Sequence, residues 1–273
     1  MTDLPASGQP RSSLSAPPPP QPDFPPSVLS ALRELSLLPY ENLSKIVAYH
    51  QQGTGETSLV LASDWLQANQ DTGAGGTCFS LTWWLRERMR AAGLDCAFLM
   101  GDKGGAKNIH CALRFDWGGR AFLLDPGYMI FEPLILPGAG LSAAAWISPN
   151  EVRLEDSPAG GVWRLWSGPR GEVKWRFDFR KRAVSEEEFL AHWRESYRLP
   201  MMRYPVLNRL RDGVQYYLQK RSLLVRSPEG GSIRKLSRTE LLEALQVTFG
   251  IPEGLGREAL DIVTSADADF FRK

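Results

Sequence analysis

The chain has 273 residues, 43% of them hydrophobic, and its 32 basic and 31 acidic residues give a formal net charge of +1. This length and apolar content suffice for a substantial core in one to three modest domains. The balanced charge argues against a strongly basic nucleic-acid binder and against an acidic solvating tail, so no nucleic-acid partner is expected.

Three cysteines, Cys78, Cys96 and Cys111, are an odd number in a chain of this length, which fits a reducing cytosol better than a secreted disulfide framework. They form no close Cys-x-x-Cys pair, so no metal is expected. The N-terminal stretch has no cationic start before an apolar run, and nowhere do about 18 apolar residues follow one another. We therefore expect a cytoplasmic protein with neither a secretion signal nor a membrane span.

Residues 1–26 contain nine of the 20 prolines and lack Val, Ile, Trp and Tyr, which predicts a disordered Pro-rich tail. Residues 27–93 show helical spacing from Ser27 onward, with further helical stretches at 57–68 and 77–92. The last of these begins at Cys78, and Gly93 is well placed to end it.

Residues 94–184 contain short apolar and aromatic runs at 97–100, 109–115, 121–124 and 174–179, separated by turns that bear glycine. This pattern predicts an antiparallel sheet or a small barrel. Residues 185–273 mix predicted helices at 186–197 and 238–249 with predicted strands near 214–218 and 222–225. The fold class is therefore expected to be α+β.

Cys78 is the most conspicuous candidate for chemistry, because Gly75-Gly76-Thr77-Cys78 places a thiol in the first turn of a predicted helix. Helix N-termini stabilise thiolates, and their unpaired amides can bind an oxyanion. Taken alone, the pattern is weak, since a buried and inert cysteine is the commoner case.

Residues 108–125 predict two antiparallel strands joined at Gly118-Gly119. If both glycines form the loop, Asp125 lies opposite Ala112 and diagonal to His110. If the loop is shifted by one residue, His110 lies directly opposite Asp125. Either register brings an imidazole and a carboxylate together.

A thiol at a helix start, a base and a carboxylate are the three parts of an activated-thiol catalyst. Cys78, His110 and Asp125 are therefore the candidate catalytic residues, although the sequence does not show that Cys78 reaches His110. From Arg164 to Arg226 there are 15 basic and 7 acidic residues. Both a solvated surface and an electropositive rim for a phosphorylated acyl carrier such as coenzyme A explain this excess.

Several motifs resemble those of the arylamine N-acetyltransferase family. Pro39-Tyr40-Glu41-Asn42-Leu43 is similar to its Pro-Phe-Glu-Asn-Leu segment, and Gly75-Gly76-Thr77-Cys78-Phe79 to its Arg-Gly-Gly-x-Cys-Phe motif. Asp125-Pro126-Gly127-Tyr128 is similar to its Asp-Val-Gly-Phe, and residues 247–251 resemble its C-terminal Phe-Gly-Ile. The resemblance runs from about Ser27 to Pro252.

The resemblance implies a cysteine-protease-like fold with an N-terminal helical domain at 27–93, a central antiparallel β-barrel at 94–184 and a C-terminal α/β lid at 185–273. It implies that Cys78 takes an acetyl group from acetyl-CoA as a thioester and passes it to an arylamine, a hydrazine or a similar amine in a ping-pong cycle. His110 would act as general base and then acid, and Asp125 would orient and stabilise the imidazolium.

The chain departs from the family motif at Ala74, Ser80 and Thr82, where the family has an arginine, an acidic residue and an asparagine. Loss of an arginine and an acid together leaves neither charge stranded, which favours the replacement of a structural ion pair. The departures leave the acyl donor open. The alternatives are a thiol-dependent amide synthase or transglutaminase-like enzyme with another donor, and a catalytically silent binding module whose cysteine has an ordinary pKa.

Overall fold

Helices α1 (Pro26–Ser36) and α4 (Cys78–Ala91) bury their apolar residues in one shared cluster, as their spacing predicts. α4 begins at Cys78, and Gly93 follows it with φ +72°, in the left-handed region that favours glycine. The predicted helical stretch at 57–68 lies outside the described residues. The computed structural model describes residues 22–52, 69, 71–158 and 160–272.

An eight-stranded antiparallel sheet follows the helices, in the order β5-β4-β3-β2-β9-β8-β7-β6. Its strands are β2 (Ala97–Lys103), β3 (Ala106–Trp117), β4 (Arg120–Asp125), β5 (Ile130–Ile135), β6 (Ser142–Ile147), β7 (Asn150–Asp156), β8 (Val162–Gly168) and β9 (Lys174–Arg180). The two edge strands, β5 and β6, touch one another, so the sheet is nearly closed and is called the barrel below. The predicted antiparallel barrel is confirmed, and the strands β5 to β8 are added to it.

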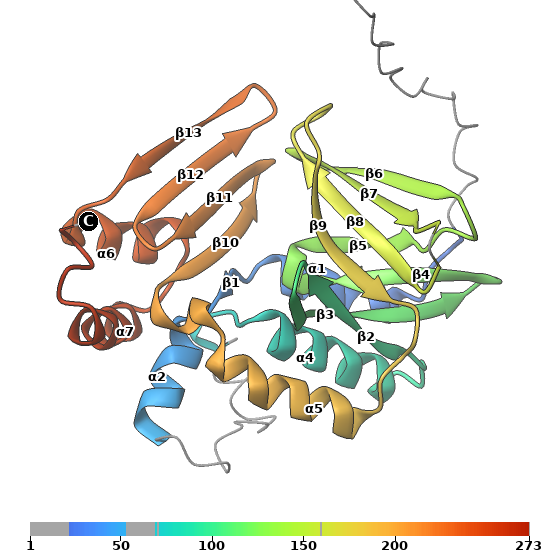
Figure 1. Cartoon of the computed structure of the whole chain (residues 1–273), viewed down its shortest axis with the longest axis horizontal. Helices are drawn as coiled ribbons and strands as arrows, with labels where there is room; N and C mark the ends of the chain where they lie inside the picture. Colours follow the sequence, from blue (N-terminus) through green and yellow to red (C-terminus); the bar gives the residue numbers. More distant parts are fainter. Residues whose placement is uncertain (1–21, 53–68, 70, 159, 273) are drawn as a thin grey trace, which may run out of the picture.

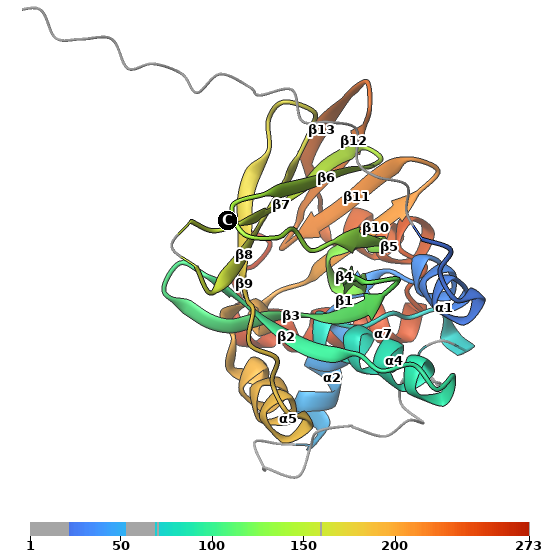
Figure 2. The same ribbon diagram turned by 90° about the vertical axis from the view of Figure 1, so that its right-hand side faces the viewer.

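The helices cover one side of the barrel. α4 lies alongside β2 and β3 in both views of the ribbon, and α1 packs against α4 (Figure 1; Figure 2). α5 (Glu186–Glu195) joins the same apolar cluster through Phe189 and Trp193, and a short 3-10 turn follows it. This packing holds the start of α4 against the barrel strands.

A second, five-stranded antiparallel sheet is called the C-terminal sheet below. Its strands are β1 (Tyr40–Glu41), β10 (Val206–Arg211), β11 (Val214–Gln219), β12 (Ser222–Ser227) and β13 (Gly230–Lys235). The predicted helix at 238–249 is α6 (Arg238–Glu243) followed by a π-helical turn (Ala244–Thr248), and α7 (Glu253–Ala266) comes after it.

The N-terminal region contributes directly to this C-terminal part. β1 pairs with β10, with Tyr40 opposite Asn208. α2 (Leu43–Gln52) packs against α7, and Leu43 is buried in a second apolar cluster together with residues of α7 and of the C-terminal sheet. The sheet therefore contains strands from both ends of the chain (Figure 1).

The last residues of the expected Pro-rich tail are part of the fold. The indole N–H of Trp117 donates a hydrogen bond of 2.9 Å to the Asp23 carbonyl oxygen, and the Phe24 ring packs edge-on against Phe122 with a centroid distance of 4.9 Å. Phe24 thus gains an aromatic partner that composition alone does not reveal. Residues 1–21 lie outside the described part of the chain.

Within the described residues, no helix has both the length and the apolar character needed to cross a membrane.

Candidate active site

Gly75 allows the chain before Cys78 to pass against the loop that begins at Pro39. A Cβ at Gly75 would lie 1.6 Å from the Pro39 carbonyl oxygen, so no side chain fits there. The next residue, Gly76, accepts a backbone hydrogen bond of 3.0 Å from the Glu41 amide. After this close backbone approach, Cys78 stands at the first position of α4.

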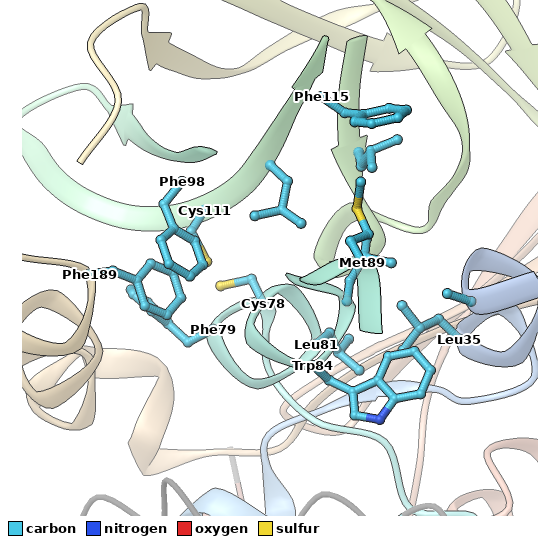
Figure 3. Packing of buried hydrophobic residues seen from close by; sticks show 14 of the residues in the cluster. Leu35, Cys78, Phe79, Leu81, Trp84, Met89, Phe98, Cys111, Phe115 and Phe189 are labelled. Carbon is cyan, nitrogen blue, oxygen red and sulfur yellow. The ribbon is translucent and has the colours of Figure 1, made fainter. Parts of the chain in front are cut away.

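Cys78 is buried, with 4% of its surface exposed, and its thiol faces that of Cys111 (Figure 3). Thr77, the residue before the helix, makes no side-chain hydrogen bond to the first amides of α4. The first amides of α4 are therefore not capped by Thr77, and the positive end of the helix lies at Cys78.

The β3–β4 hairpin brings His110 and Asp125 together. Trp117 pairs with Arg120, so both glycines form the loop, which is the first of the two expected registers. His110 Nε2 lies 2.8 Å from one carboxylate oxygen of Asp125 and 3.0 Å from the other. Both side chains are buried, and the Tyr128 amide also donates a 2.9 Å hydrogen bond to Asp125.

Because Nε2 is engaged with Asp125, Nδ1 is the ring nitrogen left for Cys78, with which His110 also interacts. The structure therefore brings the three sequence-predicted site residues together, at the junction of α4 with β3 and β4. The turn Pro126–Tyr128 closes this junction, since it starts directly after Asp125 and packs against α4.

The electrostatics of the site favour a thiolate beside an imidazolium. A hydrogen bond from Cys111 and the positive charge of His110 hold the pKa of Cys78 well below the ordinary value, although burial opposes them. Burial also lowers the pKa of His110, but the charges of Asp125 and Cys78 outweigh it and raise that pKa to about 10. Because the pKa of His110 lies above that of Cys78, the shared proton resides on His110 and Cys78 carries the negative charge.

Two further residues near the thiol were not singled out by the sequence. Cys111 is buried in the apolar cluster of α1 and α4, and its hydrogen bond is the largest influence that lowers the pKa of Cys78. Lys45 is only 4% exposed; its ammonium donates to the Ser196 hydroxyl and lies 4.3 Å from the centroid of the Tyr197 ring. Burial lowers the pKa of Lys45 to about 8, and its charge helps to lower that of Cys78.

The three departures from the family motif are buried and internally satisfied. Ala74 is fully buried, and the Ser80 hydroxyl donates a 3.0 Å hydrogen bond to the Thr77 carbonyl oxygen. The Thr82 hydroxyl donates to the carbonyl oxygen of Cys111 at 3.4 Å. The replacement of an ion pair stays a hypothesis.

A cavity of about 460 Å³ lies beside the candidate site, between the barrel and the C-terminal sheet. It is called the inter-sheet cavity below. Phe177 lines it and stacks on His110 with a centroid distance of 4.3 Å, while Tyr128 lines it and meets His110 edge-on at 6.1 Å. The cavity therefore begins one aromatic ring away from the imidazole.

Gly127 is the residue of the closing turn that lies on Cys78. A Cβ at this position would lie 2.4 Å from the Cys78 Cβ and 3.3 Å from His110 Cε1. We expect Gly127→Ala to displace Cys78, to lower the free energy of unfolding by about 1–3 kcal/mol and to slow alkylation of the thiol, because the site is already closely packed. Denaturant unfolding and the rate of reaction with iodoacetamide measure the two effects.

Gly105→Ala is the matched control, since nothing lies within 4 Å of the Cβ that it would add. Stability and alkylation both unchanged in Gly127→Ala would contradict the packing of this turn on Cys78.

Among the described residues, no group of His, Cys, Asp and Glu side chains is arranged to hold a metal ion.

The fold and the site together define a class: a helix that opens on a buried cysteine packs against barrel strands that carry the histidine and the aspartate, in a cysteine-protease-like fold. A scan against protein-family models finds no match, and neither does a comparison with curated protein sequences. Solved structures of arylamine N-acetyltransferases do match.

The enzyme from Mycobacterium abscessus matches with a TM-score of 0.71 and 19% identity, covering 85% of this chain and 86% of its own. That from Nocardia farcinica matches with a TM-score of 0.71 and 21% identity, covering 89% and 87%. The Mycobacterium marinum enzyme, solved in complex with CoA, matches with a TM-score of 0.69 and 17% identity, covering 86% and 91%. At these identities, the likeness shows a shared fold.

Proposed function

We propose that this protein is an N-acyltransferase that moves an acetyl group from acetyl-CoA to an arylamine, a hydrazine or a similar amine through a thioester on Cys78. The observation that carries the proposal is the buried contact of Cys78, His110 and Asp125 at the start of α4. The similarity to solved arylamine N-acetyltransferases, one of them in complex with CoA, supports the choice of donor and acceptor.

In the first half-reaction, the Cys78 thiolate attacks the carbonyl carbon of the acetyl thioester. The bond from that carbon to the CoA sulfur breaks, and the His110 imidazolium gives its proton to the departing thiolate. Because Cys78 is the first residue of α4, we assign the first amides of that helix to the negative charge that develops on the carbonyl oxygen of the tetrahedral intermediate. Cys78 then carries the acetyl group, and His110 is neutral.

In the second half-reaction, the amine nitrogen attacks the acetyl carbonyl carbon of the thioester. His110 takes a proton from the nitrogen as the bond to the Cys78 sulfur breaks, so the amide leaves and the thiolate–imidazolium pair is restored. Asp125 holds Nε2 throughout and stabilises each imidazolium. The inter-sheet cavity is the space that we assign to the substrates, because its wall contacts His110.

The test is intact-protein mass spectrometry after brief mixing of the full chain with acetyl-CoA. We expect a mass gain of one acetyl group in the wild type and none in Cys78→Ala, because the thiolate is the only acceptor that the mechanism uses. Cys96→Ala is the matched control: burial raises the pKa of Cys96 to about 12, so its loss should leave the acetyl adduct unchanged.

An acetyl adduct in Cys78→Ala would refute the assignment of the nucleophile. If the wild type forms no acetyl adduct although its Cys78 thiol is alkylated rapidly, acetyl-CoA is refuted as the donor. An inert thiol without any adduct would refute the catalytic function itself.

A further inference from the structure

Two arginines, one from each sheet that encloses the inter-sheet cavity, are hydrogen-bonded to neutral groups. Arg176 of β9 donates to the Ser167 carbonyl oxygen from Nε and Nη2, at 3.1 and 2.9 Å, and from Nε to the Ser167 hydroxyl at 3.2 Å. Arg226 of β12 donates from Nη1 to Asn150 Oδ1 at 3.0 Å. Within the described residues, neither guanidinium makes a hydrogen bond or an ion pair with a carboxylate.

The two guanidinium groups act on one another across the cavity. Burial and the positive charge of Arg176 lower the pKa of Arg226, although Tyr128 in the cavity wall and Glu172 outside it oppose this. The described wall of the cavity also includes Lys103 and contains no acidic side chain. Two like charges that share a partly buried space are stabilised by an anion placed between them.

This arrangement differs from that of other basic residues in the same stretch of sequence. Arg164 pairs with Asp178 at 2.8 Å, Lys181 with Asp156 at 2.6 Å and Arg182 with Glu188 at 2.6 Å. The basic excess between Arg164 and Arg226 is thus partly neutralised by ion pairs, whereas the two cavity arginines keep their charge facing the cavity.

The surroundings of the arginines indicate the rest of the ligand. Tyr128 and Phe177 line the cavity and contact the His110 ring, and Tyr217 and Leu210 line it as well. The Tyr128 hydroxyl lies 2.6 Å from the Ser167 hydroxyl, which in turn accepts from Arg176. Aromatic and apolar walls therefore connect the imidazole to the charged end of the cavity.

We propose that Arg176 and Arg226 form a carboxylate-binding subsite that selects aromatic amine acceptors carrying a carboxylate. This inference rests on the proposed acyl transfer. A carboxylate on the acceptor is the source that fits, since the cavity starts one ring away from His110, whereas the phosphates of CoA are separated from its thioester by the long pantetheine arm.

The first experiment measures binding alone, by calorimetry of the full chain with 4-aminobenzoate and with the near-isosteric 4-aminobenzamide. We expect the carboxylate to bind the wild type about 10- to 100-fold more tightly than the amide, as for one charge-assisted hydrogen-bonded pair. Arg176→Gln and Arg226→Gln should each lose most of this preference, and Arg226→Lys should keep part of it. Arg182→Gln removes the same charge from a surface ion pair and should keep the full preference.

Equal binding of the two compounds by the wild type would overturn the subsite, and this comparison needs no variant to fold. Retention of the full preference in both glutamine variants would overturn it as well. Because no acyl transfer is involved, the result holds even if acetyl-CoA proves not to be the donor.

The second experiment separates the sources of the anion, by comparing the rate of Cys78 acylation from acetyl-CoA and from succinyl-CoA in the wild type and in Arg226→Gln. A carboxylate on the acceptor would be supported if the two donors acylate Cys78 at rates that agree within about threefold and Arg226→Gln changes neither rate. Slower acylation by acetyl-CoA in Arg226→Gln would assign the arginine to the donor phosphates and overturn the proposal. A succinyl preference that Arg226→Gln abolishes would assign it to the acyl group, with the same consequence.

Discussion

Asp125→Asn is expected to slow the acetylation of Cys78 by about three to four orders of magnitude while leaving the fold intact. The substitution keeps the size of the side chain. It also keeps an oxygen that can accept the hydrogen bond from the Tyr128 amide, which is 2.9 Å long in the wild type. What is lost is the negative charge beside His110 Nε2. That charge is the largest influence raising the pKa of His110, so the imidazolium becomes less stable and Cys78 is less ionised.

Rapid mixing of the protein with acetyl-CoA, followed by quenching and mass spectrometry, gives the rate of acetylation directly. Asp116→Asn is the matched control, because Asp116 lies on the same strand as His110 but faces solvent, where it pairs with Arg114. A loss of less than about tenfold in Asp125→Asn would mean that the carboxylate only shapes the turn after β4.

The contact of His110 with Asp125 could be predicted because it is local. One hairpin contains both residues, and its register depends on the two-residue loop. Gly118 and Gly119 have φ values of +55° and +73°, as a tight hairpin turn requires, so the loop falls on the glycines themselves. Side chains alternate between the two faces of β3 and β4, so this register places the His110 imidazole and the Asp125 carboxylate on the same face as diagonal neighbours.

The contact of Cys78 with His110 could not be predicted in this way, because it depends on how α4 packs against β3. Helix periodicity indicates which face of α4 is apolar, but not which strand that face meets. The motif resemblance supplied only the order of the three residues along the chain. In the structure, two close approaches position the thiol: Gly75 packs on Pro39 before the helix, and Gly127 packs on Cys78 from the turn after β4.

Lys45 and the pairing of β1 with β10 were beyond prediction for related reasons. Lysine is among the residues that are least often buried, and nothing in the helical pattern around Lys45 marks it as an exception. β1 has two residues, and its partner strand begins at Val206, so neither strand length nor a turn signal connects them. Arg176 and Arg226 are brought to one cavity by the same long-range packing of the two sheets.

His110→Gln is expected to change the pH dependence of Cys78 alkylation as well as its rate. In the wild type, the pKa of Cys78 is well below the ordinary thiol value and that of His110 is raised to about 10. The thiolate therefore persists as pH falls through neutrality, and the rate of alkylation should be nearly flat from about pH 6 to 9. Glutamine removes the positive charge but keeps a hydrogen-bonding side chain.

Without the imidazolium, burial opposes ionisation of Cys78, and only Cys111 and Lys45 still favour the thiolate. A thiol of ordinary pKa is ionised to about 0.3% at pH 6, so alkylation there should fall on the order of 100-fold and then rise steeply with pH. Iodoacetamide kinetics across this range provide the profile, with His192→Gln on α5 as the control that should remain flat. A flat profile in His110→Gln would show that Cys111 and Lys45 suffice for the thiolate, and that His110 acts on the substrates alone.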